Sequence, residues 1–322
     1  MEEYMTNHVP DGTCILFLWQ NRHTVVIGRN QNCWKECRVN FLEQENGYLV
    51  RRLSGGGAVF HDLGNLNFTF IVGAGDYDVS RQLDVILEAV RSLGIHAEKT
   101  GRNDITVDGR KFSGNAFYRT GDGCYHHGTI LIRADKENMS RYLNVSKEKL
   151  ASKGVTSVKS RVANLCEFKP DITLEEVKSA LVEAFSKVYG QPAVRMEEGE
   201  LPQPDIDART EKFASWQWKY GRKIPFEYEM EKRFPWGNIQ IQFHVDEGMI
   251  QDVNVFSDAM DQEMIGMLAE QLKGCAYAEE DICRAVKAVG TDAFQAGEYT
   301  GADEPQSCRI KEDIMTLVRE SL

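Results

Sequence analysis

The pattern of apolar and polar positions predicts a first domain built mainly of strands. Residues 65–72 alternate apolar and polar side chains, as a strand with one buried face does. Residues 78–93 repeat apolar positions every three or four residues, which predicts a helix that ends at Gly94. Shorter β-rich runs predict further strands at 14–19, 24–28, 48–50, 105–107, 110–112 and 125–132, with the first two joined as a hairpin. We therefore expect an α/β fold of the α+β kind, with a mixed, largely antiparallel sheet packed with helices.

A second domain is indicated where the pattern restarts after an irregular stretch at 191–230. Thr173 and Glu176 form a capping box for a helix that precedes this stretch and ends at Gly190. Strands are then expected at 239–244 and 250–256, followed by helices near 258–273, 279–289 and 309–322. The charge changes at the same place. Residues 231–322 hold 18 acidic and 8 basic side chains, a balance of −10, whereas residues 1–230 hold 31 acidic and 30 basic. We expect a main domain over 1–228 and a small α+β domain over 234–322.

Composition narrows the class of protein. The chain has 322 residues, of which 42% are hydrophobic and 27% charged, enough for two buried cores. Its longest apolar run, 14–19, is far shorter than the roughly 20 residues of a membrane helix. Neither half has the basic excess that nucleic-acid binding needs. The eight cysteines include no CxxC pair, so a zinc site or a disulfide framework is disfavoured. We expect a cytoplasmic monomer with reduced thiols and no nucleic-acid or membrane partner.

The stretch from Arg51 to Asp62 is the first candidate site. Two arginines leave a short apolar run, glycine fills positions 55–57, and a second β-prone segment ends on a histidine and an aspartate. Successive bare N–H groups cradle anions, and guanidinium groups bind phosphate or carboxylate oxygens in pairs. The alternative is a glycine-rich hairpin with solvated arginines.

A second candidate site joins Asp104 to Lys111. The turn at Asp108-Gly109 favours a hairpin that brings the two side chains together. A carboxylate suits Mg²⁺, and an ammonium suits a phosphate or carbonyl oxygen. An ordinary surface ion pair is the alternative. The small residues at 113–116 favour the first interpretation, because a ligand lying along a strand needs room there.

Three neighbouring side chains suggest other chemistry less strongly. His126 and His127 begin a strand, so they point to opposite faces and only one can address a given pocket. Cys124 beside His126 permits a Cys–His nucleophile, although its position next to a predicted turn disfavours this. The chain contains neither a GxxxxGK[ST] phosphate loop nor a GxGxxG segment that follows a strand into a helix.

Five segments in order resemble the motif series of bacterial lipoate-protein ligases. They are 51–62 (RRLSGGGAVFHD), 101–104 (GRND), 111–116 (KFSGNA), 126–129 (HHGT) and 153–165 (KGVTSVKSRVANL). The resemblance extends over nearly the whole chain, including a C-terminal accessory domain. It implies a catalytic domain with the fold shared by biotin and lipoate ligases. The implied reaction joins lipoate to ATP as lipoyl-AMP and then transfers the lipoyl group to a lysine of apo lipoyl domains of 2-oxoacid dehydrogenase complexes or of the glycine-cleavage H protein.

The same resemblance implies roles for individual residues. Lys111 would be catalytic, contacting the carboxyl oxygen of lipoate and the α-phosphate, and Asp104 would hold Mg²⁺. The segment 153–165 would close over the adenylate, and no base is assigned for the second step. Lipoate would contact Arg52, Ser54, Gly55, Gly56, Gly57, His61, Lys111, Ser113, Gly114 and His127. ATP would contact Arg52, Gly57, Ala58, Val59, Phe60, Asn103, Asp104, Lys111, Arg161 and Val162.

Two alternatives remain open from the sequence. One is an octanoyl- or lipoyltransferase of the same fold, which forms a thioester on a cysteine and uses no ATP. The other is a non-catalytic protein that binds lipoate or lipoyl domains. The acidic accessory domain and the 101–104 segment favour the ligase. The family begins with a strand and most of a helix ahead of the segment matching Met1–Tyr4, so we expect this chain to lack them.

Overall fold

The computed structural model describes residues 1–100, 104–144, 162–290 and 306–322. They form two compact units. The first unit comprises Met1–Val26, Trp34–Arg51 and Val59–Lys219, and the second comprises Ile27–Cys33, Arg52–Ala58 and Tyr220–Leu322. The second unit therefore takes in two short segments from the N-terminal part of the chain. The domain boundaries expected at 228 and 234 stay a prediction, because the two units are defined by which residues pack together and not by domain limits along the chain.

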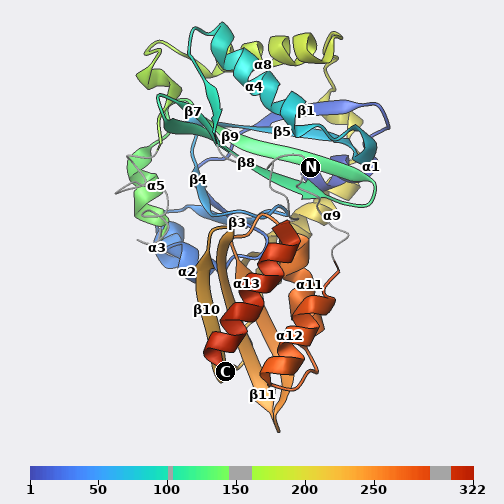
Figure 1. The fold of residues 1–322 in the computed structure, drawn as a ribbon. Helices are drawn as coiled ribbons and strands as arrows, with labels where there is room; N and C mark the ends of the chain where they lie inside the picture. Colours follow the sequence, from blue (N-terminus) through green and yellow to red (C-terminus); the bar gives the residue numbers. More distant parts are fainter. Residues whose placement is uncertain (101–103, 145–161, 291–305) are drawn as a thin grey trace. The chain divides into compact units, whose positions relative to one another are not determined.

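A six-stranded sheet forms the centre of the first unit (Figure 1). Every pair of neighbours in it is antiparallel, as the sequence predicts. The turn at Asp108-Gly109 joins two of its strands, and both turn residues have positive φ, as a type I′ turn requires. In sheet order the strands are β1 (Cys14–Trp19), β5 (Asn65–Gly73), β9 (Gly123–Leu131), β8 (Arg110–Arg119), β7 (Asp104–Val107) and β6 (Glu98–Thr100).

One face of this sheet is covered by α4 (Val79–Ser92) and α8 (Leu174–Tyr189). The ring of Phe70 on β5 lies 6.2 Å from that of Phe185 on α8. We call this the α4 face. Both helices end as predicted, α8 at Gly190 with φ 72° and α4 just before Gly94 with φ 84°. The capping box expected at the start of α8 is present.

The opposite face of the sheet carries the short helix α1 (Glu2–His8), and we call it the α1 face. Side chains alternate along a strand, so Asn65, Asn67 and Thr69 of β5 share this face while Phe68 and Phe70 point to the α4 face. All nine residues of β5 are buried, polar ones included. A strand with buried polar groups on one face is unusual for a plain hydrophobic core and indicates a specialised surface.

A second, three-stranded sheet corrects one sequence prediction. Its order is β3 (Tyr48–Arg51), β2 (Thr24–Ile27), β4 (Val59–His61), with β2 antiparallel to β4. The predicted hairpin of 14–19 with 24–28 is wrong, because β1 pairs with β5 in the large sheet and β2 belongs to this small one. Both runs are apolar strands, and short-range pattern does not encode which distant strand each one pairs with.

Besides α1, α4 and α8, the structure describes the helices α2 (Cys33–Glu36), α3 (Val39–Gln44), α5 (Lys136–Tyr142), α9 (Gln203–Ala214) and α10 (Trp216–Tyr220) before the strands of the second unit.

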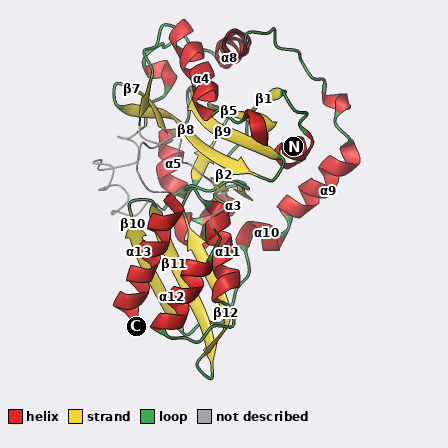
Figure 2. Ribbon diagram, turned by 45° about the vertical axis from the view of Figure 1, so that its right-hand side comes forward, coloured by secondary structure: helices red, strands yellow, loops and turns green. Residues whose placement is uncertain are grey.

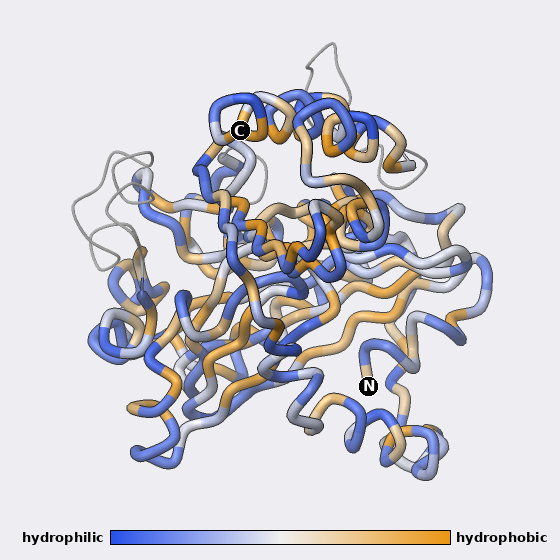
Figure 3. Tube along the Cα trace, turned by 90° about the horizontal axis from the view of Figure 1, so that it is seen from below, coloured by the Kyte–Doolittle hydropathy of each residue, from blue (hydrophilic) through white to orange (hydrophobic). Residues whose placement is uncertain are grey.

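The second unit contains the small α+β fold expected from the sequence. Its antiparallel strands are β10 (Tyr228–Phe234), β11 (Gly237–Asp246) and β12 (Met249–Ser257). One face of this sheet carries α11 (Gln262–Leu272), α12 (Glu279–Ala288) and α13 (Gln306–Ser321) (Figure 2). Their apolar sides enclose a core that includes Ile239, Phe243 and Leu268. Figure 3 shows apolar positions gathered along the strands and polar ones on the outer turns. Within the described parts of the chain, no helix is long and apolar enough to cross a membrane.

His126 ties the sheet of the first unit to α4. Its side chain is fully buried on the α4 face, with Nδ1 3.1 Å from Oε1 of Gln82 and Nε2 2.9 Å from Oδ1 of Asn115. Burial, helped by the neighbouring His127, lowers the pKa of His126 to about 3. The imidazole is therefore neutral in the folded protein at neutral pH.

This burial makes stability depend on pH in a defined direction. An unfolded histidine titrates near pH 6.5, so below that pH the unfolded chain binds a proton that the folded chain refuses, and stability falls as pH falls towards 3. The free energy of unfolding, measured with urea at pH 7.5 and 5.5, should fall between the two pH values in the wild type. In His126→Gln this fall should be smaller by roughly 1.4 kcal/mol. The exposed His96→Gln is the matched control and should keep the wild-type loss. Equal losses in wild type and His126→Gln would contradict this role of the buried imidazole.

Candidate functional site

The Lys111 ammonium and the Asp104 carboxylate form the charged end of the candidate site. Asp104 opens β7 and Lys111 lies near the start of β8, and the tight turn between the strands brings them together as predicted. Nζ of Lys111 lies 2.5 Å from Oδ1 of Asp104, and the side chains are 21% and 18% exposed. An ion pair that is this close and mostly shielded from water holds both side chains in fixed positions.

Gly114 lets the lysine side chain lie across the strand. A Cβ at this position would stand 2.6 Å from both Cε and Nζ of Lys111, closer than atoms tolerate. The pairing of β7 with β8 is irregular between Ile105 and Thr106, next to the residue opposite Lys111, and such a bulge redirects a side chain. Gly114 therefore makes room for the lysine itself, and the ammonium is held over the α1 face.

The backbone at Lys111 is also braced by the segment that follows the undescribed residues 145–161. Lys111 forms a parallel bridge with Val162, and the N–H of Ala163 donates to its carbonyl at 2.9 Å. Two residues on, the 3-10 helix η2 (Leu165–Glu167) opens with a capping box between Asn164 and Glu167. Glu167 also accepts from Arg110 at 2.7 Å and Lys136 at 2.5 Å. Val162, one of the residues expected to bind ATP, thus lies beside the central lysine.

The charge of Glu167 is secured by these contacts. Burial acts to raise the pKa of this carboxyl. The N–H of Asn164 and the charged groups of Lys136 and Arg110 outweigh that effect and lower the pKa to about 2. Glu167 therefore stays ionised over the whole physiological range and keeps the bracing segment in place.

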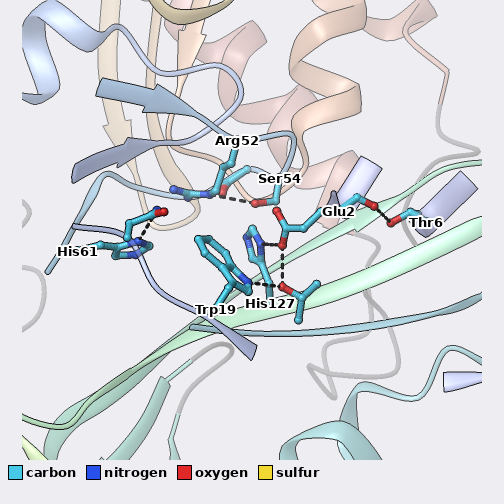
Figure 4. A network of polar contacts seen from close by, with 10 residues as sticks. Glu2, Thr6, Trp19, Arg52, Ser54, His61 and His127 are labelled. Atoms are coloured by element: carbon cyan, nitrogen blue, oxygen red, sulfur yellow. Dashed lines mark hydrogen bonds and ion pairs between the residues drawn. The ribbon is translucent and has the colours of Figure 1, made fainter. Parts of the chain in front are cut away.

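A network of polar side chains lies further along the α1 face (Figure 4). Oε1 of Glu2 accepts a hydrogen bond from Oγ1 of Thr69 at 2.7 Å and lies 2.8 Å from Nδ1 of His127. Oγ1 of Thr69 in turn accepts from the indole Nε1 of Trp19 at 3.0 Å. Burial acts to raise the pKa of Glu2, but the charge and hydrogen bond of His127 outweigh it, so the pKa is lowered. The carboxylate thereby orients the imidazole and, through Thr69, the indole.

The charged pair and the network belong to one continuous surface. Pairing places Asp104 opposite Gly114, Thr129 opposite Asn67, and Asn67 opposite Trp19, and the N–H of Gly114 lies 3.3 Å from Oγ1 of Thr129. These five residues form one row across the sheet, from β7 to β1. Strands lie about 4.8 Å apart, so roughly 14 Å separate Gly114 from Trp19. The neighbouring row contains Ala116, His127, Thr69 and Phe17. Such a surface fits an elongated anion with its charge at Lys111 and its apolar end towards Trp19.

The other residues expected at the site fall into three groups. Val59, Phe60 and His61 form β4, where Phe60 packs in an aromatic cluster and Nδ1 of His61 lies 3.3 Å from Nδ2 of Asn21. Ser113 is completely buried, and strand alternation puts it on the α4 face, away from Gly114. Asn103 and Arg161 lie outside the described residues. The ligand contacts expected of Val59, Phe60, His61 and Ser113 stay predictions.

The glycine-rich loop, Arg52–Ala58, belongs to the second unit, where other backbone segments lie against two of its glycines. The N–H of Gly56 donates to the carbonyl of Ala259 at 3.0 Å. A Cβ on Gly55 would stand 2.4 Å from the same carbonyl oxygen, and one on Gly28 would stand 2.1 Å from that of Gly56. Glycine is required here because three backbone segments meet.

Arg52 is turned back onto this loop. Its Nη2 donates to the carbonyls of Gly55 at 2.6 Å and Gly57 at 2.9 Å, and its Nε donates to Oγ of Ser54 at 2.9 Å. Figure 4 includes the contact with Ser54. The roles expected for Arg52, Ser54, Ala58 and the three glycines in binding lipoate or ATP stay predictions.

Sequence reasoning missed Glu2, Thr69 and Trp19. None of them belongs to a motif that the sequence singled out. Thr69 and Trp19 occur in strands as ordinary alternating positions, and Glu2 is one of several acidic residues in a short helix. The pairing of β1 with β5, two strands far apart in sequence, brings Trp19 to Thr69, and the packing of α1 on the sheet brings Glu2 to Thr69.

The chemistry of the donor set limits where a metal fits. Within the described ranges, no group of three or more histidine, cysteine or acidic side chains is placed to hold an ion. Asp104 contributes a carboxylate at the charged end, and its Oδ1 is engaged by Lys111. Mg²⁺ is commonly held by one or two carboxylates together with substrate phosphates and water. Asp104 fits that pattern, with phosphate oxygens as the remaining ligands.

Comparison with known proteins identifies the class. The model of the lipoyl protein ligase A/B catalytic domain matches residues 1–186, and that of the bacterial lipoate protein ligase C-terminus matches residues 223–301. The first match alone covers more than half of the chain. The chain belongs to the lipoate-protein ligase family, which confirms the resemblance seen in the sequence and the expected fold class.

Solved structures agree with this assignment. LipL1 of P. falciparum, solved with lipoate, is 30% identical, with a TM-score of 0.80 over 98% of this chain and 94% of that one. A bi-partite lipoate protein ligase from Thermoplasma acidophilum, described with its E2 lipoyl domain, is 27% identical, with a TM-score of 0.60 over 69% and 91%. A lipoate-protein ligase A bound with ATP is 25% identical, with a TM-score of 0.58 over 68% and 91%.

The geometry at Gly114 generates a test of the charged end. In Gly114→Ala the new methyl group occupies the path of the Lys111 side chain, so the end of that side chain, with its ammonium, must shift. For the catalytic role expected of Lys111, a displacement of about 1 Å costs up to roughly 100-fold in rate, and we expect a loss of roughly 10- to 100-fold in ligase activity. Gly121→Ala is the matched control, because nothing lies within 4 Å of its added Cβ. Wild-type activity in a folded Gly114→Ala variant would show that the position of the lysine is not critical.

Proposed function

We propose that this protein is an ATP-dependent, AMP-forming lipoate-protein ligase. It activates lipoate to lipoyl-AMP with release of pyrophosphate and then passes the lipoyl group to a specific lysine of an acceptor protein. The observation that carries this proposal is the Lys111 ammonium, fixed beside Asp104 at one end of an elongated surface whose other end is the indole of Trp19.

The first step requires two anions to react with each other. An oxygen of the lipoate carboxylate attacks the α-phosphorus of ATP, and pyrophosphate leaves with the electron pair of the broken P–O bond. Lys111 offsets the repulsion between the carboxylate and the α-phosphate. Asp104 would be one ligand of Mg²⁺, and the bound ion would supply positive charge against the phosphates. In the second step the neutral amine of the acceptor lysine attacks the acyl carbon, AMP leaves with the electron pair of the broken C–O bond, and the amine loses a proton as the amide forms.

Relatives support the substrates and the acceptor. One related ligase was solved in complex with lipoate, another is described as bound with ATP, and a third is described with an E2 lipoyl domain. We extend these to this chain as lipoate, ATP and apo lipoyl domains of 2-oxoacid dehydrogenase complexes. The glycine-cleavage H protein is a further proposed acceptor.

The transferase alternative needs a cysteine that reaches the acyl group, and Cys124 is badly placed for this. Its side chain is completely buried. Side chains alternate along β9, so Cys124 shares the α4 face with His126, whereas His127 and Thr129 share the α1 face with Lys111. A thiol on the far side of the sheet does not meet a carboxyl group held at Lys111.

Replacing Lys111 tests the proposed role of the ammonium. Lys111→Ala should reduce pyrophosphate release from lipoate, ATP and Mg²⁺ at least roughly 100-fold, because one preorganised charge contributes that much to a reaction of this kind. The matched control is Lys99→Ala, which breaks an ion pair with Asp84 (2.8 Å) elsewhere in the same unit and should keep wild-type rates. Unchanged turnover in Lys111→Ala would remove this lysine from the mechanism.

The same assay separates the rival functions. A non-catalytic binder releases no pyrophosphate from any of the three proteins. A transferase loses acyl transfer when Cys124 is replaced by alanine and forms no adenylate. We expect Cys124→Ala to keep both adenylate formation and transfer to an apo lipoyl domain.

A further inference from the structure

Two asparagines on β5 present hydrogen-bonding groups that no other described residue satisfies. Asn65 is fully buried and Asn67 is 1% exposed, and Nδ2 of Asn65 donates to Oδ1 of Asn67 at 2.8 Å. Within the described part of the chain, Nδ2 of Asn67 and Oδ1 of Asn65 have no hydrogen-bond partner. An amide nitrogen carries two hydrogens, so at least one N–H of Asn67 remains open whichever way the two amides are turned.

A buried amide without a partner is costly, and natural proteins retain few of them. Asn65 uses Oδ1 of Asn67 but not its N–H, and a leucine or methionine of similar volume would present no such open N–H. The open N–H of Asn67 therefore indicates a hydrogen-bonding group that the described residues do not supply.

The position of Asn67 identifies where that group must come from. Asn67 lies directly opposite both Thr129 and Trp19, in the row that runs from Asp104 through Gly114 to Trp19 on the α1 face. Two strand spacings, about 10 Å, separate it from Gly114, across which the Lys111 side chain lies. Its amide thus lies at a defined distance from the ammonium, measured across the strands of the sheet.

That distance matches the sulfur atoms of lipoate. Five C–C bonds separate the carboxyl carbon from the ring carbon that bears the first sulfur. A staggered chain of bonds near 1.5 Å advances roughly 1.25 Å per bond, so this sulfur lies about 8 Å beyond the carboxyl carbon. With the carboxylate within hydrogen-bond reach of Lys111, the dithiolane ring arrives beside Asn67.

We propose that Asn67 is a specificity-determining residue whose open N–H contacts a ring sulfur of the acyl substrate, so that the site prefers a sulfur-bearing acid to a plain fatty acid of equal length. The inference rests on the proposed function and extends it to the choice of substrate. Divalent sulfur is a weak acceptor, so the contribution is modest. Octanoate offers only methylene and methyl groups at this distance and leaves the amide unpaired.

Replacing Asn67 by leucine tests the inference. Leucine keeps the approximate volume and removes the unpaired amide of Asn67. The kcat/KM for octanoate should therefore rise and that for lipoate should fall. We expect the ratio of kcat/KM for lipoate over octanoate, measured by pyrophosphate release, to fall roughly three- to tenfold, the range of one modest hydrogen bond. Calorimetry with each acid in the absence of ATP should show the same change in the ratio of Kd values.

Gln82→Leu provides the matched control. Gln82 on α4 is also fully buried and also has an Nε2 with no partner among the described residues, and its Oε1 contacts His126 on the α4 face. This variant removes a buried amide of the same kind outside the row and should leave the substrate ratio as in the wild type. Asn67→Ala serves as a second variant in case the leucine disturbs folding, and urea unfolding checks each protein.

The outcomes are distinct. A lower ratio in either folded Asn67 variant, with the wild-type ratio in Gln82→Leu, supports the inference. An unchanged ratio in a folded Asn67 variant overturns it while leaving the proposed function intact. A wild-type protein that activates neither acid overturns the proposed function, and the inference with it.

Discussion

The ion pair of Lys111 with Asp104, laid across Gly114, is the interaction on which the site depends. A lysine has a long side chain with four rotatable bonds, and a catalytic role requires that this freedom be removed. Three features remove it here. The irregular pairing beside Lys111 sets its direction, the missing Cβ of Gly114 opens its path, and Asp104 holds its end at 2.5 Å. The bridge to Val162 then fixes the backbone from which the side chain starts.

At the far end of the surface, side chains are also held in place by a carboxylate, here through hydrogen bonds. Glu2 contacts Thr69 and His127, and Thr69 accepts from the indole of Trp19, so an aromatic ring is oriented by a half-buried carboxylate two contacts away. A partly desolvated charge is tolerated there because hydrogen bonds satisfy it. The opposite face of the same strands carries Phe68, Phe70 and the neutral His126 and serves stability. The strand period of two thus separates chemistry from packing within single strands.

The sequence predicts what short-range pattern can encode. The helix caps at Thr173 and Gly190, the turn at Asp108-Gly109 and the closeness of Asp104 to Lys111 are all confirmed, because each depends on neighbours in the chain. The family follows from five motifs in order. What the sequence does not encode locally is strand pairing between distant segments. For that reason the hairpin expected at 14–28 is wrong, and Glu2, Thr69 and Trp19 were missed.

The glycines show the same limit in another form. Gly114 and Gly55 both lie in glycine-bearing motifs, and the sequence attributes the first to a ligand and the second to a ligand or another backbone segment. The structure shows a lysine side chain over the first and a backbone carbonyl against the second, in two different units. A glycine in a motif indicates that other atoms approach the backbone closely, but the fold is needed to identify those atoms.

The central claim is that lipoate lies along the α1 face with its carboxylate at Lys111. A crystal structure of the protein with lipoate, with sulfur positions located by anomalous scattering, tests this most directly. We predict a carboxyl oxygen within hydrogen-bond distance of Nζ of Lys111 and the ring sulfurs beside Asn67, in the row between Thr129 and Trp19. A carboxylate bound away from Lys111, or a ring on the α4 face of the sheet, would contradict the account.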